Sequence, residues 1–562
     1  MTGVKSIYGL SDADLNRIAS YIEECTKNLA SIEQQLAMEL EIERPWPNHI
    51  RADLRLRKTM EIRRIRICRQ IGAPIRQFLL EILGEIFTLC LPPIMTKHKT
   101  RSLRRSEAPL LLCRVYSTWR NAAINTPHLW KQLEFRIPDP LGLSISVDLV
   151  EKMKLWVGRA RDLPVLLRLV LRKRYIPAAE AYFSLEETLS QEPLSSVCNV
   201  DISIPTSSDL YPSFKRADGF KRLESLVVRS HDNLDSTADQ SPLMLLPGAS
   251  MLRRAVLINV LSQRVSPILF PWGQLTHLYA GDSLSVKQWY CVMSYCVNLR
   301  VATFGIVGWA DYNFRPTGAP VLLSRLSVLN IMHDPTRTFG ESEFPFSGLA
   351  LPALRTLRIL SRDFCTWEGL SDYSQLHFLR ELALVGSFTI LPTHLQDLCR
   401  LFGATPLLSS LQLSIQTPYD VLFAHLLPTA NPTLLPNLEN LEIHCKFWSY
   451  VAPEEFPPVF IDLIKARWGI PLQPQAAYSS KKTVRLLQAI LYSNGMDETY
   501  LDIIRKSLKP CVDEGLDLHL GADEEGEDSI HVMPFTNDIR HWHEDLLDGG
   551  AIRFGRCQTC FD

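Results

Sequence analysis

Apolar side chains recur along this chain with two different spacings, and the first spacing is helical. From residue 11 to 43 the apolar residues stand three and four positions apart, which places them on one side of an α-helix. Ser11 and Asp14 form an N-cap pair at its start, and Pro45 and Pro47 end the helix because proline lacks an amide hydrogen. The apolar stripe consists of Leu15, Ile18, Ile22, Cys25, Leu29, Ile32, Leu36 and Leu40.

A second helical stretch is predicted from about residue 48 to 71, with Ile50, Leu54, Ile65 and Cys68 at its apolar positions. Because a short Pro-rich turn separates it from the first helix, the pattern indicates an antiparallel helical hairpin or short coiled coil over residues 11–71.

Two further helical stretches follow. Residues 74–95 carry apolar residues at helical spacing and end at Pro92-Pro93. A polar, basic loop at 97–108 separates this first stretch from the second, at about 109–125. An all-α region is therefore expected up to about residue 133.

From about residue 160 the spacing changes to short aliphatic runs that repeat. The pattern apolar-x-x-apolar-x-apolar recurs eleven times at intervals of 23 to 31 residues, and ten copies begin with Leu. Its copies are Leu166-Leu169-Leu171, Val197-Val200-Ile202, Leu223-Leu226-Val228, Leu252-Ala255-Leu257, Leu275-Leu278-Ala280, Leu299-Ala302-Phe304, Leu326-Leu329-Ile331, Leu354-Leu357-Ile359, Leu379-Leu382-Leu384, Leu408-Leu411-Leu413 and Leu438-Leu441-Ile443.

One such unit is too short to bury its own apolar residues, so neighbouring units must stack and share a core. The repeat predicts an α/β fold: a leucine-rich-repeat solenoid of parallel strands and helices over residues 160–520. After Cys445 the period loosens, with a helix expected at 456–467, a strand near 483–487, a helix at 498–514 and a strand at 516–520. An acidic, irregular tail covers residues 521–562.

Side chains between the apolar positions of each repeat point away from the core, because strand neighbours alternate faces. They form a shared, mixed and mostly polar face that suits a folded protein partner better than a phosphate backbone. The candidate target-binding residues on this face are Tyr279, Thr303, Asn330, Arg358, Gln412 and Glu442.

Composition narrows the class of protein further. The formal net charge is -1, so no overall field attracts nucleic acid or a membrane. No run of apolar residues is long enough for a membrane span, and the first ten residues lack a secretory pattern. Thirteen cysteines scattered through apolar stretches indicate a reducing compartment, so we expect a cytoplasmic or nuclear protein.

Two local clusters suggest other chemistry. The second hairpin helix is rich in arginine, which permits nucleic-acid binding; we expect instead that these arginines pair with the acidic first helix. His541, His543, Cys557 and Cys560 could hold zinc, but their spacing matches no known zinc pattern, so free thiols are favoured.

No nucleotide loop, nucleophile motif or carboxylate pair stands out, and we expect no cofactor, no metal and no enzymatic activity.

The region 74–133 resembles the F-box family. Glu81-Ile82-Leu83 and Ile86-Phe87 match its first helix, while Val115, Trp119, Arg120 and Leu129-Trp130 match its later helices. The chain departs from the family at two places: Leu79-Leu80 replaces a Leu-Pro pair, and Tyr116 replaces a cysteine. A helical hairpin, an F-box and leucine-rich units in this order also resemble a group of fungal F-box proteins.

The resemblance implies a substrate receptor of an SCF-type cullin–RING ubiquitin ligase. The F-box would dock on a Skp-type adaptor, and the solenoid would bind the protein to be ubiquitylated. The residues it implies for adaptor binding are Leu79, Leu80, Ile82, Leu83, Ile86, Phe87, Val115, Trp119 and Trp130. Two alternatives remain: a leucine-rich scaffold whose F-box no longer binds the adaptor, and a nucleic-acid-associated protein that uses the basic helix.

Overall fold

The structure is a computed structural model, and it divides the chain into two compact units, Met1–Lys131 with Arg159–Leu163 and Gln132–Gly158 with Pro164–Asp562. The structure describes residues 11–41, 46–71, 78–91, 107–137, 143–171, 197–204, 222–230, 249–258, 260, 270–307, 320–334, 345–366, 374–390, 395–428, 431, 433–445, 456–470, 484–493 and 498–522.

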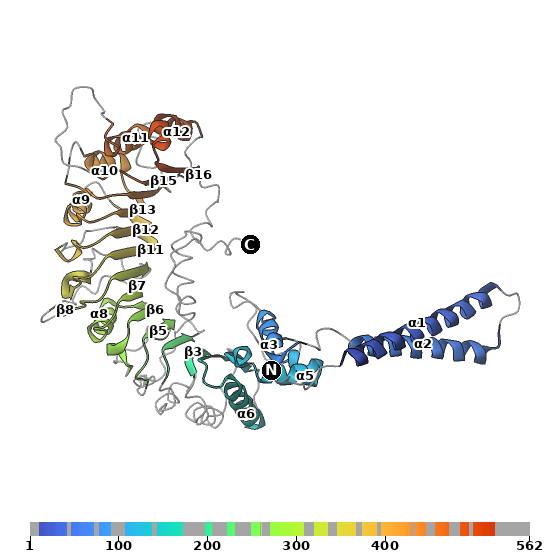
Figure 1. Ribbon diagram of the computed structural model, residues 1–562. Coiled ribbons are helices and arrows are strands. Elements are labelled where there is room, and N and C mark those ends of the chain that lie inside the picture. The colour runs from blue at the N-terminus through green and yellow to red at the C-terminus, as the bar shows by residue number, and fades with distance from the viewer. Residues whose placement is uncertain are drawn as a thin grey trace, which may run out of the picture. The chain divides into compact units, whose positions relative to one another are not determined.

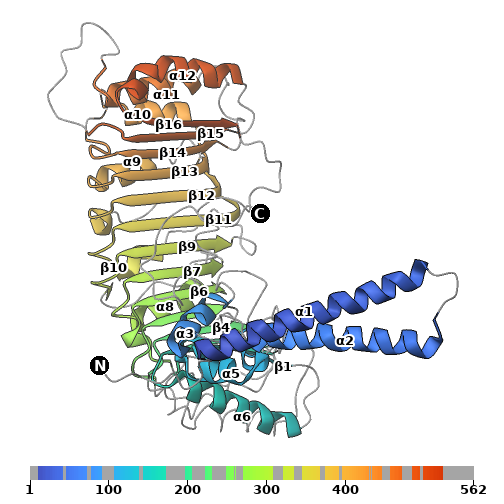
Figure 2. The same cartoon turned by 45° about the vertical axis from the view of Figure 1, so that its right-hand side comes forward.

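The first unit begins with two long helices, α1 (Asp12–Glu41) and α2 (Asn48–Ile71). They lie side by side in both ribbon views (Figures 1 and 2). Lys58 Nζ lies 2.8 Å from Glu33 Oε1, and Cys25 contacts Glu61, so the helices run antiparallel. The predicted hairpin is confirmed, and its helices begin and end within two residues of the expected positions.

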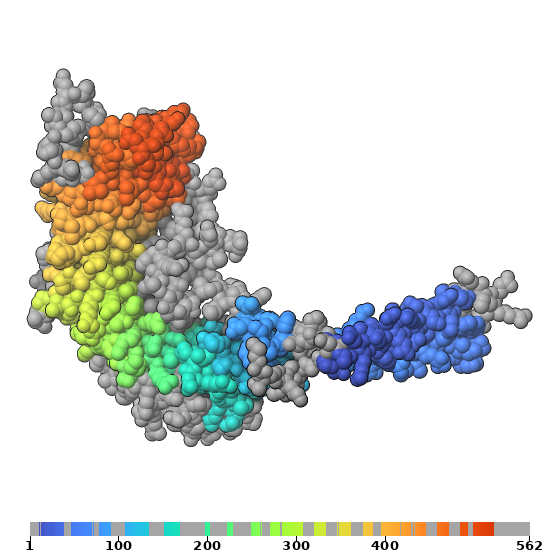
Figure 3. Space-filling model, viewed as in Figure 1, coloured from blue at the N-terminus to red at the C-terminus, as the bar shows by residue number. Residues whose placement is uncertain are grey.

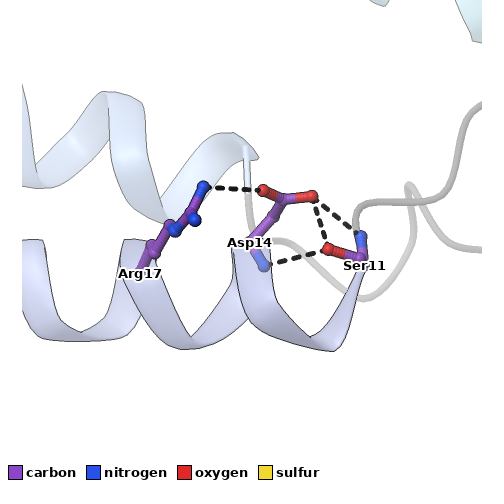
Figure 4. A network of polar contacts seen from close by, with 3 residues as sticks. All are labelled: Ser11, Asp14 and Arg17. Carbon is purple, nitrogen blue, oxygen red and sulfur yellow. Dashed lines mark hydrogen bonds and ion pairs between the residues drawn. The ribbon is translucent and has the colours of Figure 1, made fainter.

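The N-cap pair of α1 is also confirmed (Figure 4). The backbone N–H of Asp14 donates to Ser11 Oγ at 3.2 Å, while the Ser11 hydroxyl donates to Asp14 Oδ2 at 2.6 Å. Asp14 Oδ2 accepts from the Ser11 backbone N–H as well, and Arg17 stands 3.8 Å from the other carboxylate oxygen. These bonds lower the pKa of Asp14, the Ser11 hydroxyl first among them.

The rest of the first unit consists of short helices: α3 (Leu80–Leu89), α4 (Leu112–Val115), α5 (Ser117–Ile124) and the 3-10 turn η2 (Pro127–Trp130). The helix expected at 74–95 is shorter than predicted, and Pro92-Pro93 lies outside the described residues. The helical stretch expected at about 109–125 is present as two helices. Tyr116 adopts an extended conformation at φ −162° and divides the segment in two.

In its described residues the second unit is built on one fourteen-stranded parallel sheet, which makes it an α/β structure. In the sheet the strands follow one another in chain order, except that β8 and β10 form a separate pair. They are β1 (Gln132–Ile137), β2 (Val165–Leu171), β3 (Val197–Ile204), β4 (Ser225–Ser230), β5 (Arg254–Ile258), β6 (His277–Leu284), β7 (Val301–Val307), β8 (Val321–Leu322), β9 (Val328–Asp334), β10 (Leu349–Ala350), β11 (Thr356–Thr366), β12 (Glu381–Thr389), β13 (Ser410–Gln416), β14 (Asn440–Cys445), β15 (Gln488–Ser493) and β16 (Asp517–Ala522).

Helices or 3-10 turns lie between several pairs of successive strands. Figure 2 shows the strands stacked one above another, and the colour bands of Figure 3 follow the same order through this unit. The connecting elements are α6 (Leu143–Ala160), η5 (Trp272–Gln274), α8 (Val286–Tyr295), η6 (Pro345–Gly348), η7 (Ser374–Leu376), α9 (Leu395–Ala404), α10 (Tyr419–Leu426), α11 (Phe456–Arg467) and α12 (Glu498–Asp513).

The core of this unit lies on the sheet face that carries the repeated apolar positions. From the second copy of the repeat onward, every one of these side chains is buried. Helices close the core from the other side: Trp289 of α8 is fully buried and meets Phe304 of β7 edge-on, with ring centroids 6.2 Å apart. A single repeat could not bury these side chains by itself, because their burial needs a neighbouring repeat on each side.

Two predictions near the ends of the repeat array are wrong: which residues of the first copy face the core, and where one of the last strands begins. In the first copy Val165 and Leu167 are buried while Leu166 is half-buried, because Leu167, and not Leu166, aligns with Leu133 and Val200. Because Val165, Leu166 and Leu167 are all aliphatic, the sequence alone does not show which of them point into the core. The strand expected at 483–487 is also wrong: β15 begins at Gln488, and Leu486, Ala489 and Leu491 fill the buried positions.

The remaining elements predicted after Cys445 are confirmed. The helix at 456–467 agrees with α11, the helix at 498–514 is one residue longer than α12, and β16 begins one residue after and ends two residues beyond the strand expected at 516–520. The tail from residue 523 onward, with its four candidate zinc ligands, lies outside the described residues.

Candidate partner-binding surfaces

The short helix α3 has one buried and one exposed face. Leu83, Gly84 and Phe87 are buried against the rest of the first unit. Leu79 at its N-cap is 68% exposed and Ile82 is 48% exposed. An apolar helix face open to solvent is a candidate partner-binding surface.

Aromatic packing fixes the buried face of α3. The Phe87 and Trp119 ring centroids lie 4.9 Å apart, and Tyr116 packs on Trp119 at 5.7 Å. Trp130 is fully buried, and its indole Nε1 donates to the carbonyl of Ala123 at 2.8 Å. The guanidinium of Arg159 lies 4.4 Å from a Trp130 ring centroid, a cation–π contact that covers the ring.

Gly84 allows α3 to approach the end of α5 closely, and the sequence patterns did not single it out. A Cβ atom at this position would lie 2.7 Å from Thr126 Oγ1, which itself donates to the Ala122 carbonyl at 2.7 Å. A glycine inside a helix otherwise costs stability, so this close approach accounts for it.

The nine residues implied for adaptor binding therefore occupy different environments. Leu79, Leu80, Ile82 and Val115 are exposed, Ile86 and Trp119 are half-buried, and Leu83, Phe87 and Trp130 are core residues of the unit. The buried three hold the exposed residues in place and do not themselves reach a partner in this conformation. Further exposed apolar residues of the unit that the sequence did not single out are Phe78, Leu89 and Leu111.

The six residues expected on the strand face do share one row of the sheet. Backbone register aligns Tyr279, Thr303, Asn330 and Arg358 on consecutive strands, followed by Ala383 and then by Gln412 and Glu442. All lie on the face opposite the repeated apolar positions, as alternation requires.

The expected solvent-facing, mostly polar character of this face is wrong for its first half. Tyr279, Thr303 and Asn330 are buried, and Asn330 Nδ2 donates to Thr303 Oγ1 at 3.0 Å. Val227, Val256 and Ala383 continue the same row and are apolar, and the rows on either side add Val301, Met332, Leu360 and Val385. With Tyr279 these residues form a second buried cluster.

The second half of the row is polar and partly exposed. Gln412 Nε2 donates to Glu442 Oε1 at 3.0 Å, and the same oxygen lies 2.6 Å from His444 Nε2. The His444 ring packs on Tyr492, with centroids 4.9 Å apart. Arg358, Gln412 and Glu442 are half-buried and remain the accessible members of the predicted target-binding set.

A depression of about 400 Å³ lies at the end of this sheet, lined by Tyr492, Arg505, Lys509, Val512, Leu518, His519 and Leu520. Arg505 is held by Glu498 at 2.5 Å and Asp502 at 2.9 Å, which raises its pKa through these hydrogen bonds. His519 Nε2 lies 2.8 Å from Asp517. Because most of its charges are already paired, the depression has no strong preference for an anion.

The expected pairing between cations of α2 and carboxylates of α1 is found for Lys58 and Glu33. The side chains of Glu39, Glu41 and Glu43, the other end of the acidic helix, lie outside the described residues. Arg57 and Arg64 pair within α2, with Asp53 at 2.8 Å and Glu61 at 2.6 Å. Side chains three or four residues apart on one helix meet more easily than side chains on two helices.

Other functional chemistry is not visible in the described part of the chain. Within it, no three His, Cys, Asp or Glu side chains gather where they could hold a metal ion. No described helix is both long and apolar enough to cross a membrane. Burial raises the pKa of the Cys113 thiol, although Arg159 and Arg120 act in the opposite direction, so this thiol stays protonated at neutral pH.

Comparison with known proteins adds no family to this description, since no protein-family model and no curated protein sequence matches the chain. The class that the fold itself defines is an α/β protein with one long parallel sheet and a separate helical unit.

Proposed function

We propose that this chain is the substrate receptor of an SCF-type cullin–RING ubiquitin ligase. Residues 74–133 serve as an F-box that docks on a Skp-type adaptor, and residues 160–520 form a leucine-rich-repeat solenoid that binds the target. The observation that carries the proposal is the exposed apolar face of α3, which a free-standing unit gains nothing by leaving in water.

Three exposed side chains define the proposed docking surface. Leu79 and Ile82 come from the start of α3, and Val115, which is 51% exposed, ends α4. Buried Phe87 and Trp130 hold these helices rigidly, so the surface is formed before the adaptor arrives and little ordering entropy is lost on binding.

The long parallel sheet supports the solenoid half of the proposal. Each strand pairs with the strand of the preceding and following unit, and the repeated apolar positions align across the pairs. The target would meet the accessible polar part of the strand face around Arg358, Gln412 and Glu442. The chain then positions reactants in a reducing compartment and performs no bond chemistry itself.

Co-purification tests adaptor docking. The full chain is expressed with a tagged Skp-type adaptor, as wild type and as an Ile82→Lys, Leu79→Lys double variant. Wild type is expected to be retained and the double variant lost, because two charges would be buried in an apolar interface. Leu487→Lys, another exposed apolar position that is 56% exposed and lies in the second unit, is the matched control and keeps adaptor binding.

Thermal unfolding of each variant separates loss of docking from loss of fold. Wild type that keeps its fold but is not retained by the adaptor removes the ligase assignment. A leucine-rich scaffold whose F-box no longer binds an adaptor is then the better description.

A further inference from the structure

Helix α2 carries a second apolar stripe that no described element covers. Leu56 is 60% exposed, Met60 is 49% exposed and Ile67 is 44% exposed. Leu56 and Ile67 each follow by two residues a side chain buried against α1, Leu54 and Ile65 respectively. Two residues correspond to about 200° around a helix, so this stripe faces away from α1.

The stripe is narrow. Leu56, Met60, Arg63 and Ile67 are spaced four, three and four residues apart, which is the spacing of a single coiled-coil seam. A helix that lies in a membrane surface needs a broader apolar face with large residues across it. The geometry therefore fits one partner helix better than a lipid surface.

Positive charge surrounds the seam. Arg57 and Arg64 flank it on one side and Arg66 on the other, while Arg63 lies within it. Arg55, Arg63, Arg66 and Arg69 make no ion pair with any residue in the described ranges. In all, α2 has eight lysines and arginines against two carboxylates.

This charge selects the partner. Two copies of α2 packed along the seam would bring arginines face to face at its flanks, and like charges there oppose self-association. The outward side of α1 is acidic and polar, with no apolar stripe of its own to meet the seam. A helix with an apolar seam flanked by carboxylates satisfies both the apolar and the charged parts of the surface.

We infer that the outer face of α2 is a docking site for an acidic amphipathic helix of another protein. Such a helix would lie along Leu56, Met60 and Ile67 and pair its carboxylates with Arg63 and Arg66. The site is separate from the proposed adaptor surface on α3 and does not depend on ligase function.

Two synthetic helical peptides test the inference on the full chain. They share one leucine heptad pattern and differ only in the flanking residues, which are Glu in one and Lys in the other. Fluorescence anisotropy is expected to show saturable binding of the Glu peptide that weakens as salt is added, and no binding of the Lys peptide.

Matched variants locate the site. Leu56→Gln with Ile67→Gln is expected to weaken Glu-peptide binding by on the order of tenfold or more, because two apolar contacts are lost. Ile62→Gln, also exposed on α2 but off the seam, is the control and leaves binding unchanged. Arg63→Glu with Arg66→Glu should shift the preference toward the Lys peptide. Helical circular dichroism verifies that each variant keeps its fold.

Several results would overturn the inference. Equal binding of both peptides, or binding that Ile62→Gln weakens as much as the seam variant does, would exclude a charged seam at this face. A doubled molar mass in light scattering that the seam variant abolishes would assign the face to a second copy. Vesicles of anionic lipid that bind wild type but not the seam variant would assign it to a membrane.

Discussion

The hairpin of α1 and α2 and the parallel sheet both arise from regularly spaced aliphatic residues, yet they bury those residues very differently. In the sheet, the repeated positions of β9, Leu326, Leu329 and Ile331, are fully buried. In the hairpin the stripe of α1 from Leu15 to Leu36 is half-buried apart from Cys25, and among the described side chains α2 contributes two buried apolar residues, Leu54 and Ile65.

The difference comes from the number of neighbours. A strand inside the stack is covered by a strand on each side and by helices on its core face, whereas each hairpin helix packs on one other helix. Apolar spacing predicts which side of an element is covered. How completely it is covered depends on what surrounds the element, and a single sequence does not record that.

The largest test of this comparison is the same substitution in both regions. Ile331→Ala is expected to lower the free energy of the opening that permits hydrogen exchange by about 4 kcal/mol, because the lost methyl groups leave a cavity in a fully packed site. Ile32→Ala, at a half-buried position of α1, should cost about 1.5 kcal/mol. Hydrogen exchange of peptides from β9 and α1 measures both changes. Similar losses at the two sites would show that the hairpin is as tightly packed as the sheet.

A buried charge tests whether packing alone stabilises the sheet unit. The guanidinium of Arg467, at the end of α11, donates to the carbonyls of Leu435 at 2.8 Å and Leu434 at 3.2 Å, and Leu435 has a positive φ of 49°. Burial lowers its pKa to about 10, so it remains charged at neutral pH.

Replacing Arg467 with Met keeps most of the apolar volume but removes the guanidinium donors from two carbonyls, and the Leu435 carbonyl keeps the Leu438 backbone N–H at 3.2 Å. The expected loss is about 3 kcal/mol in urea unfolding. Arg467→Lys retains the charge but has fewer hydrogen-bond donors, so its free energy of unfolding should lie between those of wild type and the Met variant. A Met variant as stable as wild type would mean that the guanidinium is dispensable for this turn.

Protonation of His277 is expected to have a smaller effect on the stability of the same unit. His277 aligns with Arg254 on the neighbouring strand, and burial followed by the charges of Arg254 and Arg300 lowers its pKa from 6.5 to about 4. The unfolded chain therefore takes up this proton first as pH falls. Stability is lost between about pH 6.5 and 4, and is unaffected by this group above that range.

His277→Gln removes this titration. Between pH 7 and 4.5 the variant should lose less stability than wild type, by on the order of 2 kcal/mol or less because the side chain is not fully buried. Urea midpoints at the two pH values give the comparison. Parallel pH curves for variant and wild type would place the His277 pKa near its ordinary value.

Much of the architecture could be read from the sequence because it follows from spacing. The hairpin, the repeated strands and helix α11 each follow a period of their own, and the shared row of Thr303 and Asn330 follows from strand alternation. The burial of that row could not be read, since it depends on apolar residues such as Met332 and Leu360 in adjacent rows. The break at Tyr116 and the close approach at Gly84 depend on tertiary contacts, which spacing does not encode.

The smallest predicted effect lies at the exposed end of the hairpin. Ser11 is exposed, and its hydroxyl caps α1 by accepting from the Asp14 backbone N–H while it donates to the Asp14 carboxylate. Ser11→Ala removes both bonds and should cost about 1 kcal/mol, measured by hydrogen exchange in the first turn of α1. Ser11→Asp keeps a cap acceptor, but it sets a second carboxylate beside Asp14 and should recover part of that loss. Because the hairpin is packed on one side, even this small loss should spread along α1, whereas loss of the Ser285 cap on α8, a helix that packs on the sheet, should stay local. Equal spread of exchange from both caps would mean that one-sided packing does not make the hairpin the more weakly held region.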